Sequence, residues 1–209
     1  MLDSLITTDA RFCVLSEVLA SYASAEGARS IHEGDRIQAA VSVVVRGRED
    51  LDFLLIKRAR SQRDPWSGHM ALPGGRRDDS DGDLRHTARR ETLEETGVDL
   101  ERVGAALGRL DDVAPSSPQL TISSFVFGVP ADTEAWVASE EIEKIFWIPL
   151  DDLKNPDNHG TVEIPLPGGP RDFPCYHLVG EHVWGLTHRI LQHFLEPYPE
   201  SDLEKLKQG

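Results

Sequence analysis

The sequence has few cysteines and no long apolar stretch. Its two cysteines, Cys13 and Cys175, lie far apart without the spacing of metal ligands, which argues against a disulfide-bonded secreted protein and favours a cytoplasmic, thiol-reducing location. No apolar run approaches the roughly 20 residues that span a bilayer, so we expect no membrane association. The acidic residues Asp3 and Asp9 are not typical of a signal peptide.

Positive charge is also scarce. The chain holds 22 basic and 36 acidic residues, a net charge of −14, which argues against binding to nucleic acid or to a membrane surface. Nine of the basic residues nevertheless lie in one segment, residues 57–90: Lys57, Arg58, Arg60, Arg63, Arg76, Arg77, Arg85, Arg89 and Arg90. Only five acids share that segment, so a phosphorylated small molecule is the expected partner. Ion pairing with surrounding acids is the alternative for about half of these arginines.

The length of 209 residues and the apolar content of 39% suit one main domain with additions at both ends. We expect a helical extension in residues 1–35, a main domain in residues 36–196 and a charged tail in residues 197–209, in a monomer or homodimer. Four apolar residues of the extension recur at helical spacing and predict a packing helix over residues 11–22: Phe12, Leu15, Leu19 and Tyr22. Residues 23–34 are small and polar, and they predict a linker.

Runs of β-branched and alternating apolar residues predict strands, the first two and the last two of which should form hairpins. The predicted strands cover residues 39–45, 53–57, 69–72, 103–108, 120–129, 145–148, 161–164 and 175–178. Helices are predicted over residues 84–96 and 186–195, and residues 133–143 are expected to be helix or loop. Strands on both sides of one helix, closed by a second helix, indicate the α/β (α+β) class with a mixed β-sheet between helices.

The stretch from Gly74 to Val98 organises the rest of the chain. A glycine-rich turn leads into the predicted helix, for which Asp83 is the expected amino-terminal cap and Gly97 the stop. Three glutamates share one face of about 100° near its end: Glu91, Glu94 and Glu95. Like charges at this spacing, at the negative end of the helix dipole, destabilise a helix by roughly a few tenths of a kcal/mol per pair. One interpretation is a solvated acidic face; the other is a site for Mg²⁺ or Mn²⁺, which prefer carboxylate oxygens and remove the repulsion.

The order of residues in this stretch resembles the Nudix box, in which a glycine is followed by Arg-Glu, a spacer pair, Glu-Glu and a second glycine. The matching residues are Leu72-Pro73-Gly74-Gly75, Arg90-Glu91, Glu94-Glu95 and Gly97. Asp81 stands where the box has a glutamate, and Thr92 where it has an aliphatic residue. The resemblance implies a Nudix hydrolase domain in residues 36–196, an α/β/α sandwich, and metal-dependent hydrolysis of a diphosphate linkage in a nucleoside diphosphate derivative.

The same resemblance implies roles for individual residues. Glu91, Glu94 and Glu95 would hold Mg²⁺ or Mn²⁺. Glu94, or Glu141 in a later acidic loop, would take the proton of the attacking water. Arg90 would pair with Glu94 and orient it. Four residues would contact the substrate: Arg58, Gly74, Gly75 and Arg76.

Further segments look like the coenzyme A pyrophosphatase branch of this family, namely residues 54–59, 67–75, 146–150 and 184–187. This branch implies that coenzyme A or an acyl-CoA is split into adenosine 3′,5′-bisphosphate and 4′-phosphopantetheine. Trp66 can instead stack a base or a sugar, which leaves a nucleotide sugar, ADP-ribose or a dinucleotide as the alternative substrate. His69 is expected to be structural. A nucleotide-binding sensor without catalysis is the second alternative, and isomerase chemistry on an isopentenyl-type diphosphate is a third.

Overall fold

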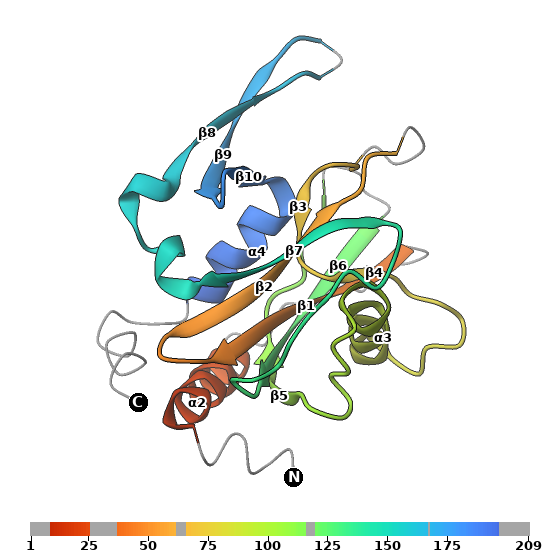
Figure 1. Cartoon of the computed structure of the whole chain (residues 1–209), viewed down its shortest axis with the longest axis vertical. Helices are drawn as coiled ribbons and strands as arrows, with labels where there is room; N and C mark the ends of the chain where they lie inside the picture. Colours follow the sequence, from red (N-terminus) through yellow and green to blue (C-terminus); the bar gives the residue numbers. More distant parts are fainter. Residues whose placement is uncertain (1–8, 26–36, 62–65, 116–119, 167, 197–209) are drawn as a thin grey trace.

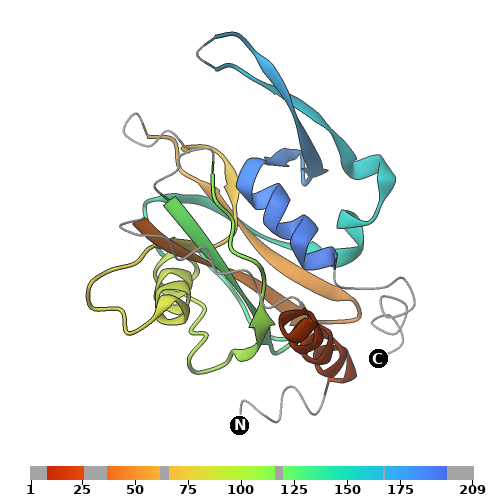
Figure 2. The same cartoon turned by 180° about the vertical axis from the view of Figure 1, so that it is seen from behind.

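The computed structural model describes residues 9–25, 37–61, 66–115, 120–166 and 168–196. A seven-stranded mixed sheet lies between helices, with α3 (Leu84–Thr96) against one face and α4 (Gly185–Leu195) against the other (Figures 1 and 2). The predicted α/β/α arrangement is therefore confirmed. The strands of this sheet are β1 (Ile37–Gly47), β2 (Leu51–Arg58), β3 (Met70–Ala71), β4 (Gly74–Arg76), β5 (Ala105–Arg109), β6 (Leu120–Val129) and β7 (Ile142–Pro149).

Strand β1 is the centre of the sheet. It runs parallel to β6 and antiparallel to both β2 and β4. Its side chains alternate between two cores, because successive residues of a strand point to opposite faces. Val43 and Val45 belong to the larger core, whereas Ala40 and Val44 belong to the smaller one beneath α3. The predicted hairpin of β1 and β2 is confirmed, with Val45 opposite Phe53.

Helix α3 begins and ends where the sequence predicts. The side chain of Asp83 accepts a hydrogen bond from the backbone amide of His86 at 2.7 Å, and Gly97 ends the helix in the left-handed conformation with φ of 70°. The face that α3 turns to the sheet is unusually polar. Thr92 Oγ1 lies 2.8 Å from Ser42 Oγ of β1, so the threonine that replaces the aliphatic residue of the box has a polar partner.

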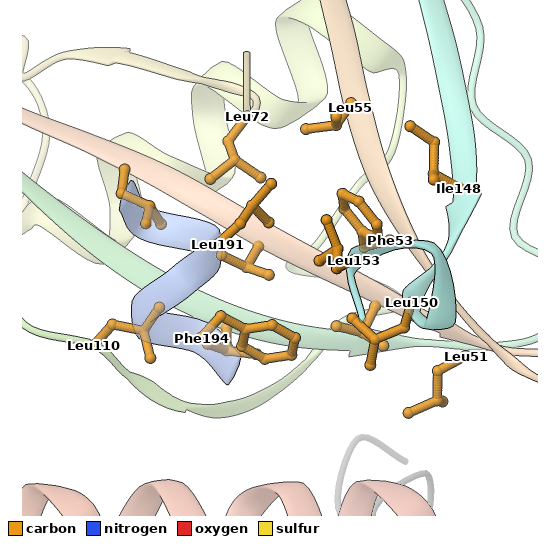
Figure 3. Close-up of a cluster of buried hydrophobic side chains, with 14 of the residues drawn as sticks. Leu51, Phe53, Leu55, Leu72, Leu110, Ile148, Leu150, Leu153, Leu191 and Phe194 are labelled. Carbon is orange, nitrogen blue, oxygen red and sulfur yellow. The ribbon is translucent and has the colours of Figure 1, made fainter. Parts of the chain in front are cut away.

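The larger core lies between the sheet and α4 (Figure 3). Leu191 and Phe194 of α4 are fully buried and belong to the same cluster as Phe53 and Leu55 of β2. The 3-10 helix η1 (Leu150–Leu153), which follows β7, adds two further leucines to this cluster. Packing of this core holds α4 against the sheet and thereby places the loops that surround the site.

A second, three-stranded antiparallel sheet consists of β8 (His159–Ile164), β9 (Arg171–Leu178) and β10 (Glu181–Trp184), preceded by the 3-10 helix η2 (Pro156–Asn158). The predicted second hairpin is confirmed as β8–β9, which extends away from the body of the molecule (Figures 1 and 2). Strands β4 and β10 were not predicted. Lys57 of β2 donates a hydrogen bond to Glu181 of β10 at 2.6 Å and so links the two sheets.

Helix α2 (Ala10–Ala25) contains the predicted amino-terminal helix. Phe12, Leu15 and Leu19 are buried, and Leu19 packs beside Gly108 of β5, which agrees with a packing role. The linker prediction is wrong for residues 23–25, which continue α2; residues 26–34, the side chain of Tyr22 and the predicted tail lie outside the described residues. Residues 133–141 are irregular, as one of the two predicted alternatives has it, whereas residues 142 and 143, predicted as helix or loop, belong to β7. The helices of the described part of the chain are too short or too polar to span a bilayer.

Candidate active site

A cavity of about 620 Å³ lies beside the glycine-rich turn and α3. Eight of the nine predicted site residues line it, and Arg90 does not: Arg58, Gly74, Gly75, Arg76, Glu91, Glu94, Glu95 and Glu141. Three aromatic rings also line it, from Trp66, His69 and Trp184. The folded chain therefore brings these predicted residues to one cavity. Trp184 belongs to a segment that resembles the coenzyme A pyrophosphatase branch, but the sequence did not predict it as a site residue.

Glu95 is the most buried of the three glutamates, with 4% of its surface exposed. Its Oε2 accepts a hydrogen bond from the backbone amide of Gly74 at 2.9 Å, and its Oε1 lies 4.0 Å from Nη1 of Arg58. Burial raises the pKa of the Glu95 carboxyl to about 8, and the neighbouring charge of Glu91 adds to the increase. The hydrogen bond from the Gly74 amide and the guanidinium of Arg58 therefore do not compensate for the burial of this carboxylate, and its pKa stays raised.

Glu91 lies against the glycine turn. A methyl group on Gly75 would come within 2.5 Å of the Glu91 carboxyl carbon, so this close approach requires a glycine. Burial raises the pKa of Glu91 as well, although Arg90 Nη1 donates a hydrogen bond to Glu91 Oε1 at 2.9 Å and opposes the increase. Two neighbouring carboxylates thus meet the cavity with their negative charge incompletely balanced.

Arg90 does not line the cavity, and its guanidinium lies in a network of carboxylates. It donates two hydrogen bonds to Asp81, with Nε 3.0 Å from Oδ1 and Nη2 3.0 Å from Oδ2. Its Nη1 also lies 3.2 Å from Glu94 Oε2, so the predicted pair with Glu94 is confirmed. The Asp81 side chain is fully buried, and the hydrogen bonds from Arg90 hold the pKa of Asp81 well below its usual range. Asp81 is therefore a partner of Arg90, which the sequence did not reveal.

The donors at the cavity wall fit a hard divalent cation. Glu91 and Glu95 offer carboxylate oxygens, and their raised pKa values show that a positive charge would stabilise the ionised forms. Within the described residues, no three His, Cys, Asp or Glu side chains are grouped closely enough to hold an ion as they lie. The Glu94 side chain is 56% exposed and turned to Arg90 at the rim. All three ligand assignments stay predictions, and of the three glutamates Glu91 and Glu95 are the better placed for a cation.

Glu141 lies on the loop before β7. Its backbone carbonyl accepts a hydrogen bond from the amide of Ala59 at 2.7 Å, which fixes the loop to the end of β2. The side chain is exposed and reaches the cavity, whereas the adjacent Glu140 does not line it. No hydrogen bond or ion pair of the Glu141 carboxylate is formed with another described residue. Its position is compatible with taking a proton in the cavity.

Among the described members of the segment 57–90, most basic residues do not line the cavity, so the expected contact with a phosphorylated small molecule concerns only part of the segment. Arg85 and Arg89 lie over the rings of Phe125 and Phe127, with guanidinium carbons 5.9 and 5.6 Å from the centroids. Lys57 pairs with Glu181 and Glu143. Among the described members of the segment, Arg58 and Arg76 are the basic residues that line the cavity.

Comparisons with known proteins identify the class of enzyme. Residues 36–165 match the family profile described as the NUDIX domain, and the chain belongs to the Nudix family. Nudix hydrolases cleave pyrophosphate bonds and generally use divalent metal ions, which confirms the predicted hydrolase class.

Similar sequences support the same family assignment. The chain is 37% identical over 150 residues to an uncharacterized protein of Schizosaccharomyces pombe, a match that covers 61% of this chain and 46% of the yeast protein. It therefore spans less than half the length of that relative. It is also 30% identical over 159 residues to an uncharacterized Nudix hydrolase, NudL, of Yersinia pestis, with 76% of this chain and 78% of NudL covered.

A solved structure supports the fold. The crystal structure of a MutT/nudix family protein from Enterococcus faecalis superposes with a TM-score of 0.51. The superposition covers 87% of this chain and 68% of the other, at 18% sequence identity. At that identity the similarity concerns the fold alone.

Proposed function

We propose that this chain hydrolyses the diphosphate linkage of a nucleoside diphosphate derivative with Mg²⁺ or Mn²⁺, and that coenzyme A or an acyl-CoA is its substrate. One observation carries the proposal: the box glutamates Glu91 and Glu95, the phosphate-binding candidate Arg58 and the loop glutamate Glu141 all line one cavity. Carboxylates for a metal, a guanidinium for phosphate oxygens and a carboxylate for a proton are the groups that this reaction needs.

In this mechanism Glu91, Glu94 and Glu95 would hold the cation, which would supply charge neutralisation for the diphosphate and a lowered pKa for a bound water. Arg58, close to the Glu95 carboxylate, donates hydrogen bonds to diphosphate oxygens. Glu141 takes the proton of the water at its carboxylate. We favour Glu141 over Glu94 as the base because Arg90 already occupies one oxygen of Glu94, while Glu141 forms no ion pair with the described residues.

Coenzyme A is favoured by the resemblance of residues 54–59 and 67–75 and by the apolar part of the cavity. Val41, Leu186 and Ile190 line this part and offer a surface for a pantetheine or acyl chain. Three residues differ from the branch pattern: Ile56, Trp66 and Leu72 replace threonine, histidine and phenylalanine. Ile56 and Leu72 are buried in the described structure, whereas Trp66 is exposed, so the Trp66 difference bears most directly on the ligand.

A substrate panel tests the proposal. Coenzyme A, dephospho-coenzyme A, ADP-ribose and diadenosine tetraphosphate are incubated with the enzyme and Mg²⁺ or Mn²⁺, and the products are identified by mass. We expect adenosine 3′,5′-bisphosphate and 4′-phosphopantetheine from coenzyme A. Removal of the 3′-phosphate should lower kcat/KM by roughly 10–100-fold, because Arg58 or Arg76 would lose a charge-assisted contact.

The panel also separates the alternatives. If ADP-ribose is cleaved best and the 3′-phosphate makes no difference, the coenzyme A assignment is wrong and the general diphosphatase assignment remains. Saturable binding without any product would identify a nucleotide sensor instead. The cytoplasmic location, the monomeric or dimeric state and the boundaries at residues 35 and 196 stay predictions.

A further inference from the structure

An aromatic wall, defined as Trp66, His69 and Trp184, lines one part of the cavity. The His69 ring lies between the two indoles, with its centroid 6.2 Å from that of Trp66 and 5.0 Å from that of Trp184. Both contacts are edge-to-face, with interplanar angles of 68° and 65°. Edge-to-face packing is a favourable arrangement of aromatic rings and gives the wall a defined geometry.

The aromatic wall is fixed by contacts with β9 and with the end of β2. Phe173 of β9 contacts Trp184, with ring centroids 5.4 Å apart. The backbone carbonyl of His69 accepts a hydrogen bond from the amide of Arg58 at 3.0 Å, and the amide of His69 donates to the carbonyl of Trp66 at 3.3 Å. The wall is thus tied to the residue that we propose as the phosphate contact. A group bound on the wall would therefore have a fixed place relative to the diphosphate.

Trp66 exposes 52% of its surface although it belongs to this ordered cluster. Exposure alone is not informative, because Trp136 is 57% exposed and does not line the cavity. Trp66 differs from Trp136 because it lines the cavity and contacts His69. A large, accessible aromatic ring in a cavity with a few polar groups is typical of a ligand-binding surface for flat, apolar groups.

We propose that the aromatic wall is the nucleobase subsite of this enzyme, with Trp66 as the ring on which the purine stacks. The inference rests on the proposed function for the identity of the ligand, and it assigns the base, and not the pantetheine chain, to this wall. The pantetheine chain of the substrate would then contact the apolar residues Val41, Leu186 and Ile190, which also line the cavity. Trp66 would act on affinity for the base and leave the bond-breaking groups unchanged.

The test measures binding of two ligands that contain no diphosphate, so it does not depend on turnover. AMP and ribose 5-phosphate are titrated by calorimetry into the full chain with Mg²⁺, for the wild type and for Trp66→Ala, Trp66→Phe and Trp136→Ala. Since ribose 5-phosphate carries a hydroxyl group at C1 where AMP carries adenine, the ratio of their dissociation constants reports on binding of the base. Base–aromatic stacking predicts a preference for AMP of about 10-fold or more that Trp66→Ala abolishes. Trp66→Phe should retain most of it, and Trp136→Ala, which removes an equally exposed indole outside the cavity, should leave it intact.

The outcomes are distinct. A wild type without preference for AMP, an unchanged ratio in Trp66→Ala, or an equal loss in Trp136→Ala would overturn the subsite. If Trp66→Ala unfolds, Trp66→Leu provides an apolar residue without a ring and should also lose the preference. If the preference follows the ring but the wild type cleaves no diphosphate, the subsite stands and the proposed hydrolase function fails. If the wild type cleaves diphosphates but Trp66→Ala does not change the ratio, the proposed hydrolase function stands and the subsite fails.

Discussion

The buried carboxylate of Glu95 accepts a hydrogen bond from the backbone amide of Gly74, with Oε2 2.9 Å from the nitrogen. This contact joins the last turn of α3 to the glycine turn that precedes the helix by ten residues. It holds the Glu95 carboxylate at the cavity wall, where Glu95 Oε1 lies 4.0 Å from Nη1 of Arg58. The pKa of Glu95 is still raised to about 8, so the contact positions the carboxylate without fully balancing its charge.

The stability of the metal-free protein should therefore decrease as the pH rises. Between the usual value of 4.5 and about 8, the folded state holds a proton on Glu95 that the unfolded state has lost. The free energy of unfolding should fall across this window, by an amount on the order of a few kcal/mol, and should not change further above it. Urea denaturation in EDTA across this pH range measures the effect. Glu95→Gln should remove most of this decrease and leave the smaller part that comes from the raised pKa of Glu91, whereas the exposed control Glu101→Gln should retain all of it.

Removal of the metal should abolish turnover. Activity in excess EDTA should be lost and should return with Mg²⁺ or Mn²⁺, because the reaction needs charge neutralisation on the diphosphate. Glu91→Gln keeps the size of the side chain and removes one ligand charge, so kcat should fall by about 10²-fold or more with the fold preserved. Full activity in EDTA would exclude the metal mechanism. Normal turnover of Glu91→Gln would place the ligands elsewhere.

Gly75→Ala should disturb Glu91 without disturbing the fold. The added methyl group would come within 2.5 Å of the Glu91 carboxyl carbon, and that flexible side chain would have to move. Loss of ligand orientation of this kind typically costs 10–100-fold, so we expect kcat to fall by about that factor. Gly82→Ala is the matched control, because a methyl group there would meet only His86 Nδ1 at 4.0 Å. Equal kinetics of the two variants would contradict the role given to Gly75.

Arg90→Ala should destabilise the protein strongly. It removes both hydrogen bonds to Asp81 and leaves a fully buried carboxylate without its counter-charge. Breaking a buried pair in this way costs about 3–5 kcal/mol of unfolding free energy. The double variant Asp81→Asn/Arg90→Ala should regain part of this loss, since no uncompensated charge remains. Additive effects of the two substitutions in urea denaturation would show that the pair is not coupled.

Glu141→Gln should affect the chemical step if Glu141 accepts the proton. A general base contributes about 10²–10⁴-fold, so kcat should decrease by that range with little change in KM. Glu140→Gln is the natural control, because the adjacent glutamate does not line the cavity. If Glu94→Gln lowers kcat and Glu141→Gln does not, the base is Glu94.

Local signals in the sequence determine the framework of this site. Asp83 and Gly97 bound α3 as predicted, because caps depend on side-chain chemistry and backbone conformation at single positions. The spacing of Glu91 and Glu95 places both on one face of any helix that contains them. The β-branched run of β1 likewise defines a strand that is buried on both faces.

Tertiary structure decided which groups these residues meet. Strand β4 consists of two glycines and an arginine, which have little strand propensity, and it exists because β1 pairs with it. The sequence has nine basic residues in the segment 57–90, but it does not show which of them line the cavity. In the folded chain, Arg85 and Arg89 lie over the rings of Phe125 and Phe127 of β6. The aromatic wall unites Trp66 and His69 with Trp184, more than a hundred residues further along the chain. Such contacts depend on how α4 and β10 pack against the main sheet, and no local pattern encodes the direction of a side chain across that distance.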